Sequence, residues 1–109
     1  MVTPEALSEL AAICPGVAEM TEGGLTYIHL PGLKILDAGG TVVVDALLCP
    51  QARDGYSTRL FLSQPIPGRG ANWTTHRILD RTWHVWSWNG VPADLRPAQI
   101  LAGHLRALR

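Results

Sequence analysis

Apolar residues recur with the period of a helix in two segments, one near each end of the chain. The first begins with a helix-start signal, in which Thr3 is the N-cap, Pro4 takes the first helical position and Glu5 lies in the first turn. Apolar side chains follow at helical spacing as far as Cys14. The second segment opens at Asp94 or Pro97, and its apolar stripe comprises Ile100, Leu101, His104, Leu105 and Leu108. Both segments are predicted to be amphipathic helices.

Between these helices, four segments rich in β-forming residues are separated by glycine-containing turns. They span Val17–Met20, Leu25–Leu30, Thr41–Leu48 and Arg59–Ser63. The third is nearly continuous in apolar residues apart from Asp45, so we expect it to lie centrally in an antiparallel meander. Gln64–Asn72 follows, and its prolines and glycines predict a long irregular loop. The expected fold class is therefore α+β, with a helix packed on an antiparallel sheet.

Three of the four tryptophans gather in Arg81–Asn89, which reads R-T-W-H-V-W-S-W-N. In a strand, successive side chains point to opposite faces, so His84, Trp86 and Trp88 would share one face and Trp83 the other. In a helix, Trp83 and Trp86 would be neighbours instead. The segment is an aromatic block in both cases, and the sequence leaves open whether it is core or binding surface.

Length and composition predict a single domain over residues 1–109, because 47% of the residues are hydrophobic and suffice for one core. No stretch approaches the roughly 18 apolar residues that a membrane span requires, and the first residues lack the pattern of a signal peptide. Cys14 and Cys49 form neither a disulfide framework nor a CxxC pattern, which fits a reducing compartment. We expect a cytoplasmic protein.

The charge is balanced overall but divided between the two halves of the chain. Residues 1–52 hold six acids and one lysine, whereas residues 53–109 hold eight arginines and three acids. Arginine favours planar, bidentate contacts with carboxylates or phosphates. The halves either neutralise each other across the fold or leave a basic face for an acidic protein partner. Scattered arginines and a pI of about 6.9 argue against nucleic acid as the partner.

Several segments, taken in order, resemble a known family. Leu47-Leu48-Cys49-Pro50 leads into Gly55-Tyr56, the block Asp80–Ser87 reads D-R-T-W-H-V-W-S, and Leu95-Arg96-Pro97 opens the last helix. This order is similar to the ubiquitin-conjugating enzyme (E2, UBC-like) superfamily, and more narrowly to its bacterial branch, prokaryotic E2 family E. The resemblance implies a UBC-like fold and a role in a bacterial ubiquitin-like conjugation system. The implied partners are an E1-like adenylating enzyme, a ubiquitin-like protein and a JAB-type metallopeptidase.

The resemblance also implies where a catalytic cysteine would lie, and the sequence departs from it there. An E2 carries its modifier as a thioester on a cysteine after the fourth strand, but no cysteine occurs between Gln64 and Arg81. We therefore expect a non-catalytic E2-like binding module, a pseudoenzyme without a cofactor. The alternatives are an unorthodox E2 that uses Cys49, a histidine-based activity around His76 and His84, and a small structural subunit of an oligomer.

Candidate binding residues follow from the types that dominate protein interfaces, tryptophan and arginine. They are Arg69, Trp73, Arg77, Trp86 and Trp88. The four histidines show none of the familiar metal-ligand spacings, so no metal site is predicted.

Overall fold

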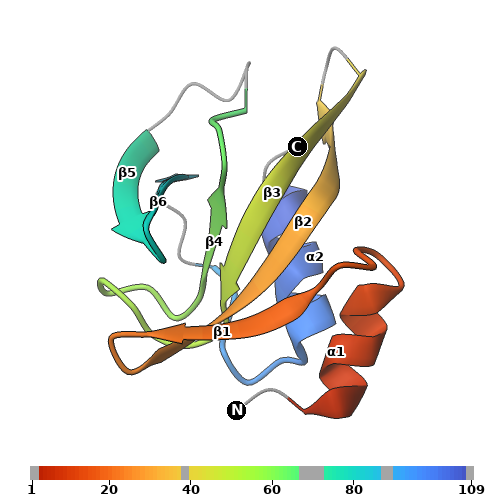
Figure 1. The fold of residues 1–109 in the computed structure, drawn as a ribbon, viewed down its shortest axis with the longest axis vertical. Helices are drawn as coiled ribbons and strands as arrows, with labels where there is room; N and C mark the ends of the chain where they lie inside the picture. Colours follow the sequence, from red (N-terminus) through yellow and green to blue (C-terminus); the bar gives the residue numbers. More distant parts are fainter. Residues whose placement is uncertain (1–2, 38–39, 67–72, 87–89, 108–109) are drawn as a thin grey trace.

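The computed structural model describes residues 3–37, 40–66, 73–86 and 90–107, which form two helices and six strands (Figure 1). The helices are α1 (Pro4–Ala11) and α2 (Pro97–Ala107). The strands are β1 (Ala18–Glu22), β2 (Leu25–Asp37), β3 (Gly40–Cys49), β4 (Arg59–Leu62), β5 (Trp73–Ile78) and β6 (Arg81–Trp86). No helix in these ranges is long and apolar enough to cross a membrane.

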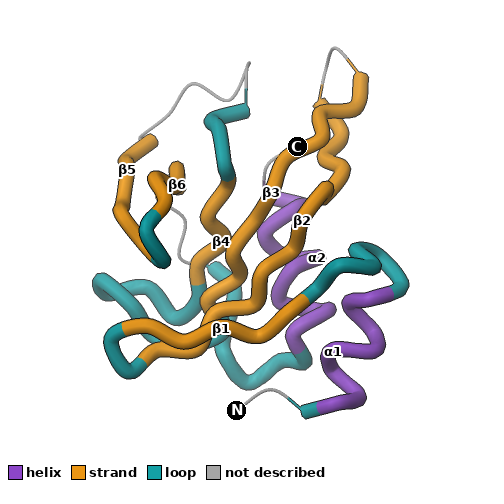
Figure 2. Tube along the Cα trace, in the orientation of Figure 1, coloured by secondary structure: helices purple, strands orange, loops and turns teal. Residues whose placement is uncertain are grey.

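All the strand pairs are antiparallel, and the strands lie in the order β1-β2-β3-β4-β6-β5 (Figure 2). The first four form the expected meander, although β2 continues beyond Leu30 to Asp37 through a bulge at Pro31-Gly32. The strands β5 and β6 form a hairpin. Within the described residues this hairpin joins β4 through one register pair, Leu62 with His84.

Both helices cover one face of the sheet. Leu10 of α1 and Ile100 and Leu101 of α2 pack against buried side chains of β2, β3 and β4. These strands contribute alternate residues, as their period of two requires: Ile28, Leu30, Val44, Ala46, Leu48, Leu60 and Leu62. We call this the first core.

The opposite face of the same strands forms a second core. Tyr27, Leu47, Cys49 and Phe61 are buried there together with Ile78, Trp83 and Val85 of the β5–β6 hairpin. The hairpin therefore packs over this face, which explains why β3 and β4 are apolar on both sides. Asp45, the polar interruption of β3, lies at the margin, where its carboxylate accepts hydrogen bonds from Gly32 N (3.0 Å) and Arg81 Nη2 (3.0 Å).

The turn of the hairpin contains two residues, Leu79 and Asp80, with φ values of 54° and 61°. Positive φ at both positions is the hallmark of type I′ turns, which usually contain Asn-Gly. The Leu79 N–H donates to the Glu22 carboxylate (2.7 Å), so the end of β1 is tied to this turn. The two outermost strands of the sheet are thereby linked at one end.

The UBC-like fold that we expected is wrong. The structure is a six-stranded antiparallel sheet with two short helices, whereas we expected a four-stranded meander with the Trp-rich segment outside it. The difference arises at Trp73–Trp86, which supplies two further strands of the sheet. The start of α1 is confirmed, because Thr3 Oγ1 accepts from Ala6 N (3.1 Å), but the helix ends at Ala11. Cys14 lies beyond that end and is still buried in the first core.

Candidate functional site

The second core is bordered by a group of cationic and aromatic side chains, which we call the arginine–aromatic cluster. Its members are Tyr27 of β2, Arg53 and Tyr56 of the β3–β4 connection, Arg59 and Phe61 of β4, and His76 of β5. Strand alternation places Tyr27, Arg59 and Phe61 on the second face of the sheet. The β5–β6 hairpin brings His76 onto the same side.

A tight turn sets the positions of Arg53 and Tyr56. Their backbones exchange two hydrogen bonds, each of 2.9 Å, around Asp54-Gly55. Asp54 and Gly55 have φ values of 55° and 84°, and Asp-Gly is one of the pairs that two-residue turns prefer. The turn directs the Asp54 carboxylate to both Arg53 and Arg59.

The cationic groups converge on the ring of Phe61. The guanidinium carbons of Arg53 and Arg59 lie 5.2 and 5.7 Å from its centroid, and the His76 ring meets it edge-on at 5.6 Å between centroids. Arginine within about 6 Å of an aromatic ring is attracted by the ring's quadrupole. Arg53 is fixed further by a hydrogen bond from its Nε to the Tyr27 hydroxyl (3.1 Å).

Arg59 is the most deeply buried charge of the cluster, with a side chain that is 4% exposed. Its guanidinium carbon lies 4.0 Å from the centroid of the Tyr56 ring, and its Nη1 lies 3.4 Å from Asp54 Oδ2. Its Nε is buried and has no hydrogen-bond partner among the residues that the structure describes. Burial lowers the pKa of this guanidinium, and the neighbouring Tyr56 and Asp54 oppose that shift. A buried N–H without a partner is costly, so it marks a position where an acceptor would be favourable.

His76, one of our catalytic candidates, belongs to this cluster. Partial burial, followed by the charges of Arg53 and Arg59, lowers the pKa of His76 below its ordinary value of 6.5. The imidazole is therefore neutral near physiological pH. Its Nε2 lies 3.3 Å from Thr74 Oγ1.

Cys49, the thiol among our catalytic candidates, lies in the second core beside the cluster and is 0% exposed. Burial raises the pKa of the Cys49 thiol, and the opposing effects of Gln51 and Arg53 are smaller. Burial likewise raises the pKa of Cys14. Because a thiolate is the attacking species in acyl transfer, neither cysteine has the environment of a nucleophile.

Of the strand and the helix that the sequence left open for the Trp block, the structure shows the strand over Arg81–Trp86. Trp83 and Val85 lie in the second core, whereas Trp86 packs against the first. Trp86 pairs with Trp73 across the hairpin at 5.6 Å between centroids and meets the His104 ring edge-on at 6.0 Å. The tryptophans that the structure describes are thus largely core residues.

The remaining candidates are spread over the fold. His84 is half-buried opposite Leu62, and Arg77 is exposed on β5 opposite Thr82. Arg69 and Trp88 lie outside the described residues. The structure thus places Cys49 and His76 on the same side of the sheet, each near Phe61, and brings Trp73 and Trp86 into contact. No group of three metal-ligating side chains occurs within the described ranges.

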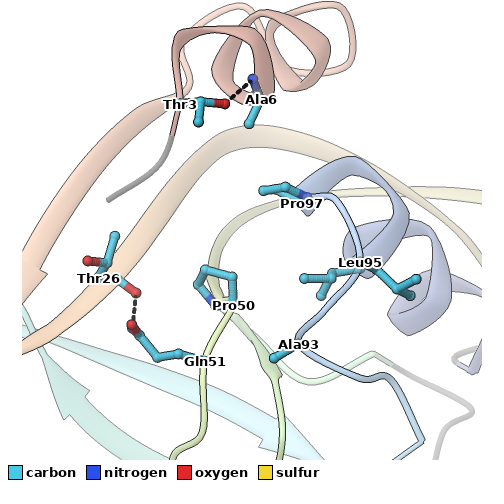
Figure 3. Close-up of a pocket in the computed structure, with 9 residues that line it drawn as sticks. Thr3, Ala6, Thr26, Pro50, Gln51, Ala93, Leu95 and Pro97 are labelled. Carbon is cyan, nitrogen blue, oxygen red and sulfur yellow. Dashed lines mark hydrogen bonds between the residues drawn. The ribbon is translucent and has the colours of Figure 1, made fainter.

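A pocket of about 260 Å³ lies where the starts of both helices approach the end of β3 (Figure 3). Thr3, Pro50 and Pro97 line it from different elements. The amide of Gln51 on its wall already donates to the Thr26 carbonyl (2.6 Å). No titratable side chain lines this pocket, so we place the candidate site at the arginine–aromatic cluster.

Sequence reasoning missed most of this cluster. Arg53 is not among the predicted candidates, and Arg59 appears only as the first residue of a predicted strand. The available signal was the Asp54-Gly55 turn between Arg53 and Tyr56, with Arg59 shortly after it.

Comparison with known proteins gives no match to a family model, to a curated protein or to a solved structure.

Proposed function

We propose that this protein is a non-catalytic binding module and that its arginine–aromatic cluster binds an acidic segment of a partner protein. The observation that carries the proposal is the buried Arg59, which has an unpartnered Nε. Two arginines share one aspartate in the turn, so the site has an excess of positive charge. Carboxylates satisfy arginine best because they accept two parallel hydrogen bonds from one guanidinium.

The neighbouring aromatic rings fit the same role. Tyrosine and arginine are enriched at interface hot spots, where aromatic surface excludes water from charged contacts. Arg53 is 19% exposed, so part of the cluster is open to a partner. The buried thiols give this proposal more support than the alternative of a thioester on Cys49.

The test measures binding of a fluorescent, acetylated and amidated hexaglutamate peptide by anisotropy, with hexaglutamine as the uncharged control. Arg53→Gln should weaken binding about tenfold or more, the usual effect of losing one charge-assisted hydrogen bond. Arg106→Gln removes the same charge from the exposed end of α2 and should change the affinity little. Equal losses in both variants, or no binding by the unmodified protein, would refute a specific acidic site.

The partner itself is proposed from the sequence resemblance alone. The block Asp80–Ser87 supports an E1-like enzyme or a ubiquitin-like protein of a bacterial conjugation system, and the six-stranded fold adds no support. The test incubates the protein with both partners and ATP, and compares it with Cys49→Ser on a non-reducing gel. A stable complex without a reductant-sensitive adduct is expected. An adduct that Cys49→Ser abolishes would overturn the non-catalytic role.

A further inference from the structure

The carboxylate of Asp54 occupies the position in the cluster that an acidic ligand would take. Its Oδ2 contacts Nη1 of Arg53 and lies 3.4 Å from Nη1 of Arg59. One oxygen of one residue thus serves both guanidiniums. The chain supplies this carboxylate to itself from the tip of a two-residue turn.

Asp54 satisfies Arg59 incompletely. Charge-assisted hydrogen bonds between nitrogen and oxygen are usually about 2.7–2.9 Å long, shorter than the 3.4 Å between Arg59 and Asp54. The Arg59 Nε is enclosed and finds no partner in the described part of the chain. Because the Tyr56 ring lies over the guanidinium, a ligand reaches Nε only when the turn carrying Asp54 and Tyr56 shifts. A carboxylate that takes the place of Asp54 could meet both Nε and an Nη of the same guanidinium.

Asp54 is also well placed to leave. Its side chain is 45% exposed, and its ion pair with Arg53 lies at the surface, where such pairs hold their partners weakly. The turn forms a small unit closed by the two Arg53–Tyr56 backbone hydrogen bonds. None of its residues, Arg53 to Tyr56, belongs to the first core.

We infer that Asp54 is a built-in competitor, and that a partner's side-chain carboxylate binds by replacing Asp54 between Arg53 and Arg59. This inference rests on the proposed function and specifies the group that the site recognises. When a site is filled by its own chain, the apparent affinity for a ligand is the intrinsic affinity multiplied by the fraction of molecules in which the site is free. Removing the internal carboxylate therefore tightens binding of the external one.

The test compares hexaglutamate binding by the unmodified protein, Asp54→Asn and Asp94→Asn. Asp54→Asn keeps the turn, because Asn-Gly is the pair that two-residue turns prefer most. Asp94→Asn makes the same charge change in an exposed residue before α2. Asp54→Asn should bind up to about fivefold more tightly, as the strength of an exposed ion pair implies, whereas Asp94→Asn should match the unmodified protein.

The outcomes separate this inference from the proposed function. Equal affinities for the two aspartate variants, or weaker binding by Asp54→Asn, would overturn the competitor role. A tenfold loss in Arg53→Gln would leave the acidic site standing in that case. A triglycine peptide with a free or an amidated C-terminus identifies the source of the carboxylate. Tighter binding of the free form than of hexaglutamate would overturn recognition of a side chain.

Discussion

His104 allows a quantitative prediction because its hydrogen bonds show which ring nitrogen carries the hydrogen in the neutral imidazole. The Thr58 hydroxyl donates to the Val91 carbonyl (2.8 Å), so its oxygen is left to accept from His104 Nε2 (2.9 Å). The proton of neutral His104 therefore lies on Nε2. Its Nδ1 is buried and has no hydrogen-bond partner within the described ranges of the chain. Protonation would place a second N–H and a charge there, where none of the described residues offers an acceptor.

This environment lowers the pKa of His104 from 6.5 to about 4, through burial first and the charge of Arg59 second. At pH values between these two pKa values, His104 is protonated in the unfolded chain and neutral in the folded protein. The free energy of unfolding therefore falls as the pH falls from about 6.5 to 4, by about 1.4 kcal/mol for each pH unit. The total loss is about 3 kcal/mol, a large share of the roughly 5–15 kcal/mol typical of such domains.

Urea unfolding followed by tryptophan fluorescence tests this value at several pH values between about 7.5 and 4.5. The variant His104→Gln keeps an N–H for Thr58 and does not titrate. As the pH falls over this range, the unmodified protein should lose about 2–3 kcal/mol of stability relative to His104→Gln. The other histidines affect both proteins equally. A pH-independent difference would refute the reasoning. If the variant does not fold, an NMR titration that finds a His104 pKa above about 6 would refute it equally.

Three further predictions concern the hairpin and the cluster. Trp83→Ala should destabilise the protein by about 3–5 kcal/mol, since Trp83 is buried and donates to the Ile78 carbonyl (3.1 Å); an unchanged urea midpoint would contradict its place in the second core. Asp80→Gly should stabilise the protein by about 0.5–1 kcal/mol by relieving a φ of 61°, and a lower melting temperature would count against strain in this turn. Arg53→Gln should raise the pKa of His76 toward its ordinary value, because Arg53 is the largest charge effect on it; an NMR titration with an unchanged or lower pKa would exclude this coupling.

The parts of the fold that local patterns encode were predictable. Thr3-Pro4 marks the first helix start, and segments rich in β-forming residues between turns mark the four strands of the meander. The β5–β6 hairpin escaped because its turn contains Leu79 and Asp80 in place of the usual Asn-Gly. Its first strand, W-T-T-H-R-I, is also too polar to stand out. The packing of a helix on one face of the sheet could be predicted. The packing of the β5–β6 hairpin on the other face depends on contacts between residues distant in the sequence.

The candidate site depended on the same kind of contact. Arg59 lies in a buried strand, and the groups that contact its guanidinium, the Tyr56 ring and the Asp54 carboxylate, come from the turn before that strand. His76 was singled out by its residue type, but its neighbours come from β4 and from the β3–β4 connection. Residue type was therefore enough to single out His76, whereas the arrangement of the arginine–aromatic cluster depends on contacts between segments distant in the sequence. The hydrogen bonds that Asp45 accepts from Gly32 and Arg81 likewise come from residues distant in the sequence.

Among the described residues, one register pair joins β4 and β6, so the two thiols should report different opening events. Segments with few connecting hydrogen bonds open before the whole domain unfolds. Cys49 lies under the β5–β6 hairpin, whereas Cys14 lies between helix α1 and the sheet. An alkylating reagent should therefore modify Cys49 at the rate at which the hairpin lifts, and Cys14 at the rate at which the helical layer separates. The two alkylation rates would thus measure the opening of the two layers separately within one protein.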